Sequence, residues 1–229
     1  MNVAIIVAAG SGSRAGGSGP AKQFREIAGA PVVVHTLRRF DECATIAETV
    51  AVVPAGDARD FASLARRHGI RKLARVVAGG ATRTESVREA LRTIEGGGTR
   101  VVAVHDGVRP LVRPEEIDAT VRAAEETGAA LIVAAATDTI KEVEGGRVVR
   151  TLPREGLRRA LTPQCFRLDL LRRAYERARS EGLDATDDAS LVELLGHPVT
   201  AVEGDSRNIK ITRPEDFALA EILLEEFCP

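Results

Sequence analysis

The segment Val3-Ala4-Ile5-Ile6-Val7-Ala8-Ala9-Gly10-Ser11-Gly12-Ser13-Arg14 decides the fold class of this chain. Its first seven residues are all apolar, and a glycine-rich stretch follows them directly. A short, wholly apolar strand is typical of a parallel sheet that helices cover on both faces. Seven apolar residues are too few to cross a bilayer, and no basic segment precedes them as in a signal peptide. We therefore expect a cytoplasmic protein.

Four further apolar runs alternate with helical patterns along the chain. The runs at 49–53, 73–77, 100–105 and 129–135 predict strands. Thr82-Arg83-Thr84-Glu85 predicts a capped helix start, because the Thr hydroxyl and the Glu carboxylate can accept the first free backbone N–H groups. This alternation indicates βαβ units, and hence an α/β fold with a mostly parallel, twisted sheet and helices on both faces.

One segment departs from the alternation. Residues 139–143 and 147–152 predict two short strands that are joined by the turn Glu144-Gly145-Gly146, where a crossover helix is expected instead. An isolated hairpin is only marginally stable, so we expect it to pack on another surface. A second copy of the chain is the simplest candidate for that surface.

Length and composition limit the classes of function. The chain has 229 residues, which suits one domain with an insertion at about 150 residues per domain. Its 32 Lys and Arg against 33 Asp and Glu give a net charge of −1, so bulk charge does not attract nucleic acid or an anionic membrane, and we expect neither as a partner. The widely spaced Cys43, Cys165 and Cys228 predict neither a disulfide framework nor a zinc site.

The glycine loop permits more than one interpretation. Gly10, Gly12 and Ala15 satisfy a loose dinucleotide-binding fingerprint, but the second predicted strand lacks the acidic residue at its end that such folds use to hold a ribose. The loop also carries two cations, Arg14 and Lys22, which favour binding of a triphosphate that is being cleaved. A solvated loop with incidental cations remains the alternative.

Other candidate site residues follow the predicted strands. Asp106 can hold a ribose hydroxyl or a Mg²⁺ ion that bridges phosphates, or it can be a turn residue beside an arginine. Gly80 and Ser86 suit the approach of a flat base, or simply a capped helix start. Lys210, just before the last predicted helix, suits an anion site, whereas His105 is expected to be a packed residue and not a catalyst.

Seven motifs, taken together, resemble the 2-C-methyl-D-erythritol 4-phosphate cytidylyltransferase family of the non-mevalonate isoprenoid pathway. The similarity extends from Val3 to about Glu221. The motifs lie at 8–14 with 20–23, 79–87, 105–110, 138–141, 160–164, 186–190 and 208–216. The glycine loop is common to many nucleotidyltransferases, so the later motifs make the resemblance specific.

The resemblance implies a fold and a reaction. The fold is a Rossmann-like nucleotidyltransferase domain over 1–229, with a protruding β-arm at about 137–160 through which two copies form a homodimer. The reaction moves a cytidylyl group from CTP to 2-C-methyl-D-erythritol 4-phosphate with Mg²⁺ as cofactor, and it releases pyrophosphate and 4-diphosphocytidyl-2-C-methyl-D-erythritol. A ribitol 5-phosphate cytidylyltransferase is the nearest alternative, and a non-catalytic nucleotide-binding module is a remote one.

The resemblance also assigns roles to residues of this chain. The cations implied to act on the reacting phosphates are Arg14, Lys22 and Lys210. The implied nucleotide-binding residues are Ala8, Ala9, Gly10, Gly12, Gly80, Ser86 and Asp106, and Asp106 is also the implied metal ligand. The implied acceptor-binding residues are Arg109, Thr139, Arg154, Thr162 and Thr186, of which Thr139 and Arg154 lie on the arm and are expected to serve the partner's site.

Overall fold

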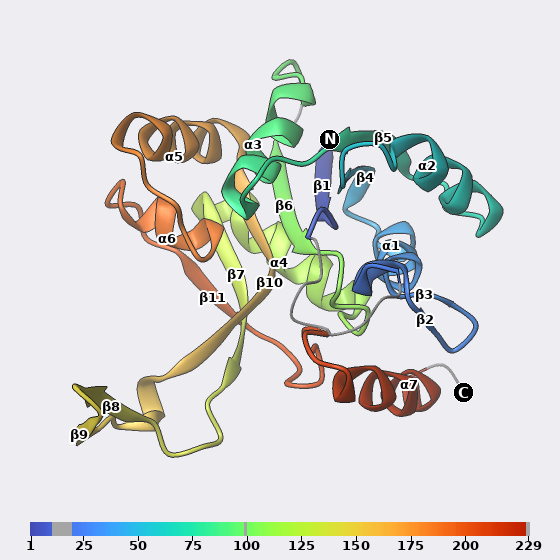
Figure 1. Cartoon of the computed structure of the whole chain (residues 1–229). Helices are drawn as coiled ribbons and strands as arrows, with labels where there is room; N and C mark the ends of the chain where they lie inside the picture. Colours follow the sequence, from blue (N-terminus) through green and yellow to red (C-terminus); the bar gives the residue numbers. More distant parts are fainter. Residues whose placement is uncertain (11–19, 99, 228–229) are drawn as a thin grey trace.

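A seven-stranded sheet forms the centre of the molecule in a computed structural model that describes residues 1–10, 20–98 and 100–227 (Figure 1). The strand order is β11-β7-β10-β6-β1-β4-β5. The strands are β1 (Asn2–Val7), β4 (Ile46–Val53), β5 (Leu73–Ala78), β6 (Val101–Asp106), β7 (Ala129–Ala135), β10 (Arg158–Arg167) and β11 (Thr200–Glu203). β10 runs antiparallel to β6 and β7, and the other paired neighbours are parallel. The predicted mostly parallel sheet is confirmed.

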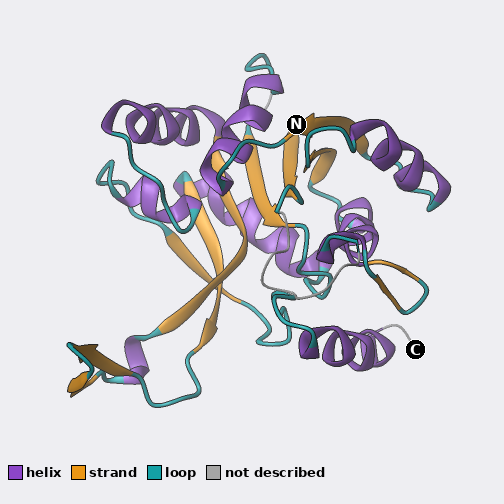
Figure 2. Ribbon diagram, in the orientation of Figure 1, coloured by secondary structure: helices purple, strands orange, loops and turns teal. Residues whose placement is uncertain are grey.

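Helices cover both faces of this sheet, as predicted (Figure 2). One face packs against α1 (Val32–Glu42), α2 (Ala58–Arg67) and α4 (Pro114–Thr127). The other face packs against α3 (Arg83–Thr93), α5 (Leu168–Glu181) and α6 (Asp188–Glu193). The last helix, α7 (Glu215–Phe227), forms a smaller cluster with residues that include Ile27 of the short strand β2 (Glu26–Ile27), which pairs with β3 (Ala30–Pro31).

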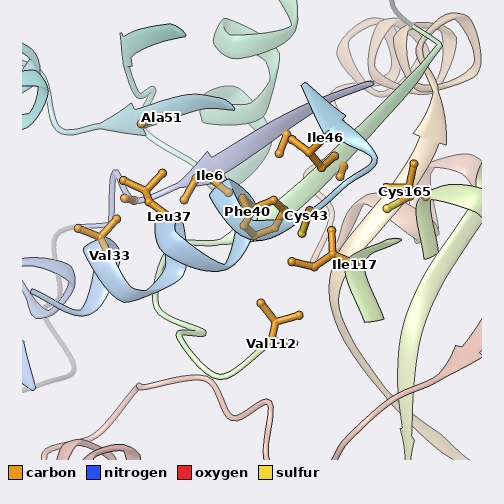
Figure 3. Close-up of a cluster of buried hydrophobic side chains, with 14 of the residues drawn as sticks. Ile6, Val33, Leu37, Phe40, Cys43, Ile46, Ala51, Val112, Ile117 and Cys165 are labelled. Carbon is orange, nitrogen blue, oxygen red and sulfur yellow. The ribbon is translucent and has the colours of Figure 1, made fainter. Parts of the chain in front are cut away.

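The apolar residues of β1 pack alternately on the two faces of the sheet. Ala4 and Ile6 belong to the cluster under α1, whereas Val3 and Ile5 belong to the cluster under α3, and all four are fully buried. Successive side chains of a strand point to opposite faces, so a central strand has no polar face and reads as a continuous apolar run. Figure 3 shows the first cluster, in which Phe40 of α1 fills the space beside β1.

The antiparallel strand β10 explains why a hairpin stands where a crossover helix was expected. Only parallel neighbours require a long crossover, and β7 is paired with an antiparallel neighbour, so the chain can turn back directly. The arm lies in this connection, with β8 (Lys141–Glu144) and β9 (Arg147–Thr151) paired beyond the main sheet (Figure 1). Its turn is Gly145-Gly146, with φ of 55° and 77°, as a two-residue hairpin turn requires.

His105 is a packed residue, as predicted. It is fully buried in β6, and its ring centroid lies 4.9 Å from that of Phe40. Its Nε2 lies 3.1 Å from the carbonyl oxygen of Arg109, and its Nδ1 lies 3.0 Å from Oγ1 of Thr162. Burial is the main cause that lowers the pKa of His105 to about 4, so the imidazole is neutral in the folded protein.

We expect acidification from pH 7 to 4.5 to destabilise the wild-type protein more than it destabilises a His105→Gln variant. The unfolded chain takes up a proton on this imidazole near pH 6.5, but the folded chain does so only near pH 4. Stability from this residue is therefore present above pH 6.5 and is lost as the pH falls toward 4, by roughly 3 kcal/mol in total. Urea unfolding at several pH values measures the difference. His68→Gln, at a half-buried histidine, is the control, and equal pH slopes for the protein and His105→Gln would contradict the expectation.

Candidate active site

A cavity of about 450 Å³ opens beside the carboxyl ends of β1 and β6. This edge of an open α/β sheet is where ligands bind, because the strand order changes direction there. Eight residues that the sequence predicted for nucleotide binding or catalysis line the cavity: Ala8, Ala9, Gly10, Lys22, Gly80, Ser86, Asp106 and Lys210. The tertiary fold therefore brings together residues that are up to about two hundred positions apart in the chain.

The glycines after β5 are needed for close packing around the cavity. A Cβ atom on Gly79 would lie 2.3 Å from the Cβ of Ala9, and one on Gly80 would lie 2.5 Å from the Cβ of Glu85. Thr82 Oγ1 accepts a hydrogen bond from the backbone N–H of Glu85 at 3.1 Å, so the predicted cap of α3 is confirmed. The Glu85 carboxylate accepts from the backbone N–H of Ala81 at 2.7 Å, which fixes the loop that leads into the helix.

Gln23 supports the other side of the cavity, although nothing in its motif singles it out. Its side chain is buried, and its Nε2 donates to the carbonyl oxygens of Ala8 at 2.8 Å and Gly10 at 3.0 Å. These two bonds tie the end of β1 to the short 3-10 turn Lys22–Phe24. A buried amide that satisfies strand-end carbonyls produces no periodic signal in the sequence, and only the tertiary contact reveals it.

The Asp106 carboxylate is the electrostatic centre of the site. One oxygen, Oδ2, lies 2.9 Å from Lys210 Nζ and 3.4 Å from Arg109 Nε, and the other, Oδ1, lies 3.4 Å from Arg83 Nε. Burial by itself raises the pKa of this carboxyl, but the charges of Arg83, Lys210 and Arg109 outweigh burial and hold the pKa well below its usual range. Asp106 is therefore ionised at any pH at which the protein works.

A second buried carboxylate reaches the same arginine. Arg83 Nη2 donates to Oδ2 of Asp188 at 2.7 Å, so this one side chain joins two acidic residues. Burial opposes the charge of Arg83, but Asp188 and Asp106 outweigh burial and raise its pKa. From the sequence, Arg83 suits either a base-binding segment or a capped helix start, and Asp188 has no assigned role.

Arg109 and Thr162, two predicted acceptor-site residues, are buried behind Asp106. The Arg109 guanidinium donates through Nη1 to the carbonyl oxygen of Asn208 at 2.8 Å, and Thr162 Oγ1 accepts from the backbone N–H of Asp106 at 3.2 Å. Asn208 in turn donates to the carbonyl oxygen of Thr162 at 2.9 Å. These bonds link β6, β10 and the segment before α7 into one support for Asp106 and Lys210.

Three of the remaining predicted residues, Thr139, Arg154 and Thr186, do not line the cavity within this chain. Thr139 and Arg154 lie exposed on the arm, where Arg154 Nη1 donates to the carbonyl oxygen of Thr137 at 2.9 Å. Thr186 is exposed in the loop before α6. Arg14 and Gly12 lie outside the described residues. The roles assigned to these five residues, like those assigned to the residues that line the cavity, remain predictions.

The contacts of Asp106 do not fit a metal ligand held by the protein. Mg²⁺ is bound through carboxylates together with waters and substrate phosphates. Here three cations already surround the only carboxylate of the cavity wall in the described part of the chain, and 1–10, 20–98 and 100–227 contain no group of three or more His, Cys, Asp or Glu that could hold a metal. With three donors on its two oxygens, the Asp106 carboxylate keeps about one of its four lone-pair positions open.

A larger cavity, of about 590 Å³, lies between α3 and α5. Arginines form most of its lining, and three of them already pair with a neighbouring glutamate or with a backbone carbonyl: Arg92, Arg172 and Arg179. It contains none of the converging strand-end residues that chemistry on a phosphate needs. The smaller cavity at the sheet edge is therefore the candidate active site.

The part of the chain that the structure describes has no helix long and apolar enough to cross a membrane.

Residues 2–226 match the family described as 2-C-methyl-D-erythritol 4-phosphate cytidylyltransferase. The 2-C-methyl-D-erythritol 4-phosphate cytidylyltransferase of Pelotomaculum thermopropionicum is 44% identical over 224 residues, which cover 97% of this chain and 93% of that protein.

Two crystal structures share the fold over nearly the whole chain. The 4-diphosphocytidyl-2C-methyl-D-erythritol synthase of Anaerococcus prevotii superposes with a TM-score of 0.85 at 28% identity, covering 97% of this chain and 95% of that one. The 2-C-methyl-D-erythritol 4-phosphate cytidylyltransferase of Thermus thermophilus superposes with a TM-score of 0.78 at 35% identity, covering 98% of both chains. With the site geometry and the match over residues 2–226, these similarities show that the chain belongs to the 2-C-methyl-D-erythritol 4-phosphate cytidylyltransferase family.

Proposed function

We propose that the protein transfers the cytidylyl group of CTP to 2-C-methyl-D-erythritol 4-phosphate and releases pyrophosphate. The observation that carries this proposal is the cavity at the sheet edge, where Lys22 and Lys210 border a glycine-lined wall and a buried Asp106. Family membership gives the substrates, and the cavity supplies positive charge where a triphosphate would lie. The product is 4-diphosphocytidyl-2-C-methyl-D-erythritol, a precursor in isoprenoid biosynthesis.

The reaction needs charge and alignment more than it needs a base. An oxygen of the acceptor phosphate forms a bond to the α-phosphorus of CTP, and the bond from that phosphorus to the oxygen bridging to the β-phosphate breaks. The electron pair leaves with pyrophosphate. A phosphate monoester is already anionic at pH 7, so no residue has to remove a proton from it. This agrees with a neutral, fully buried His105 that faces the backbone and Thr162 instead of the cavity.

The two lysines suit the negative charge that builds on the reacting phosphates. Lys210 Nζ is held 2.9 Å from Asp106 and is partly exposed, so it is both oriented and accessible. Lys22 enters the cavity from the turn that Gln23 ties to β1. We propose these two, with Arg14, as the cations that stabilise the transition state, because charges held beside the reacting phosphates stabilise the negative charge that develops there.

The remaining wall suits the nucleoside. Ser86 is buried, and its hydroxyl donates to the carbonyl oxygen of Thr82 at 2.9 Å while accepting from the N–H of Gly80 at 3.2 Å. We propose that the backbone of Ala8, Ala9 and Gly80 contacts the cytosine and that Asp106 accepts from a ribose hydroxyl. CTP is proposed to enter as its Mg²⁺ complex, with the ion held by phosphate oxygens, since Asp106 is already surrounded by cations.

Two finer properties are part of the proposal. The arm carries the exposed apolar side chains Val143, Val148 and Val149, which a partner subunit would cover in a homodimer. Thr139 and Arg154 would then complete the acceptor site of the partner.

The buried, unpaired Cys43 and Cys165 suit a reducing compartment, and we propose that the protein acts in the cytoplasm.

Purified protein with CTP and Mg²⁺ is expected to release pyrophosphate only when 2-C-methyl-D-erythritol 4-phosphate is supplied. A coupled phosphate assay measures kcat/KM for this acceptor and for ribitol 5-phosphate in parallel. A higher kcat/KM with ribitol 5-phosphate would favour the alternative, a ribitol 5-phosphate cytidylyltransferase. No pyrophosphate with either acceptor would contradict the assignment.

Replacement of Lys210 by Ala is expected to lower kcat by about 10² to 10⁵, because a fixed charge at the reacting phosphates is lost. Arg213→Ala is the matched control, since Arg213 is an exposed cation three residues away that faces Glu215 at 3.9 Å and does not line the cavity. Steady-state kinetics with both substrates saturating measures the effect. Equal activity of the two variants would remove Lys210 from the catalytic set.

Mixed dimers are expected to regain activity that neither parent variant has alone. In a dimer of one Lys210→Ala chain and one Arg154→Ala chain, one of the two sites would combine an intact Lys210 with an intact Arg154 from the partner's arm. The mixture should therefore recover up to about a quarter to a half of the wild-type rate, depending on how chains exchange. Absence of recovery, with mixed dimers shown by native mass spectrometry, would place Arg154 in the site of its own chain.

A further inference from the structure

Behind the cavity lies a buried polar chain that the reaction itself does not use. Asp188, the first residue of α6, has no exposed side-chain surface, and Tyr175 of α5 is 4% exposed. The Tyr175 hydroxyl donates to Oδ1 of Asp188, and Arg83 Nη2 donates to Oδ2 of the same carboxylate at 2.7 Å. Nε of the same guanidinium faces Asp106, at 3.4 Å from Oδ1.

We infer that Asp188 and Tyr175 are positioning residues for nucleotide binding, which act by holding Arg83 against Asp106. This inference rests on the proposed function, in which Asp106 contacts the ribose of CTP. Three cations surround Asp106. Among the described residues, Arg83 is the only one of the three that also contacts a second buried carboxylate, and that carboxylate belongs to Asp188. Arg83 is thereby fixed between two acids and does not collapse onto one of them.

The surroundings of Asp188 show that the carboxylate is placed rigidly. The backbone N–H groups of Asp188 and Ala189 both donate to Oε1 of Gln164 at 2.9 Å, and Gln164 Nε2 donates to Asp187 at 3.0 Å. Thr84 Oγ1 donates to Asp184 at 2.6 Å and ties the preceding loop to α3. The start of α6 is therefore anchored to β10 and to the helix that begins with Arg83.

Tyr175 selects the orientation of the carboxylate. A carboxylate with two equivalent oxygens can rotate, and a donor fixed on one oxygen leaves the other aimed at Arg83. Burial, and then the charge of Asp188, raise the pKa of the Tyr175 hydroxyl, so it remains a donor across the working pH range. The phenol ring packs in the cluster under α5 whether or not the hydroxyl is present.

Tyr175→Phe and Asp188→Asn test the inference because they change hydrogen bonds with little change of shape. Both variants are expected to raise the Kd of CTP, measured by calorimetry, by about fivefold to tenfold, the scale of one ordinary hydrogen bond. The KM for CTP should rise in step, whereas kcat at saturation and the KM for the acceptor should stay within about threefold of wild type, because the lysines remain in place.

Thr120→Val is the matched control for loss of a buried hydroxyl. Thr120 is fully buried on α4, on the opposite face of the sheet, and its Oγ1 donates to the carbonyl oxygen of Glu116 at 2.7 Å. This variant should lower the melting temperature by an amount similar to Tyr175→Phe and leave the Kd of CTP unchanged. If Tyr175→Phe and Asp188→Asn also bind CTP within twofold of wild type, the inference is overturned.

Arg83→Lys gives a second, independent result. A single ammonium group cannot span both carboxylates, so this variant alone should weaken CTP binding, and adding Tyr175→Phe to it should weaken binding little further. If the two single losses of CTP affinity multiply in the double variant, the inference is overturned. It is also overturned if kcat and the KM values for both substrates worsen in proportion to the loss of stability, because that would show a merely structural role. Calorimetry needs no turnover, so a wild-type protein that binds CTP but releases no pyrophosphate would contradict the proposed function while still testing this chain of contacts.

Discussion

The Asp106 carboxylate is the group on which the site depends. It is buried at the end of β6, and burial of a charge is tolerated only where opposite charges and hydrogen bonds compensate it. Arg83, Arg109 and Lys210 provide the compensating charges, and each comes from a different part of the chain. The ionised state of Asp106 and the positions of these cations are therefore mutually dependent, and a change to one alters the rest.

The sheet explains how these groups meet. β1 and β6 are parallel neighbours, so the glycine loop and Asp106 leave the sheet at the same edge. Antiparallel β10 brings Thr162 to the same edge from the opposite chain direction, and the segment after β11 returns Asn208 and Lys210 to it. The arm is a consequence of the same antiparallel pairing, since the chain between β7 and β10 needs no helix to return.

Much of this was accessible from the sequence, but unevenly. The five nearly apolar runs predicted strands within a few residues of their observed ends, because strands that are covered on both faces are mostly apolar. β5, at the edge of the sheet, is the least buried of them. β10 was not predicted, because its first residues are arginines and a Thr-Pro step interrupts it. β11 was not predicted, because it is only four residues long and lies at an edge of the sheet. Of the predicted site residues, Ala8, Asp106 and Lys210 line one cavity, whereas Gln23 and Asp188, to which the sequence assigned no role, make contacts with partners far away in the sequence.

The sequence by itself determined the α/β class, the parallel core, the glycine-rich segment after the first strand and the family, because apolar periodicity, turn residues and motif spacing are local properties. Only the tertiary structure decided that Asp106 would be shared by three cations and that Arg83 would be shared by two acids. It also showed that Thr139 and Arg154, which the resemblance had already placed on the arm, do not line the cavity of their own chain. Charge compensation in a buried site depends on distances between atoms from different strands, and those distances exist only after the sheet has formed.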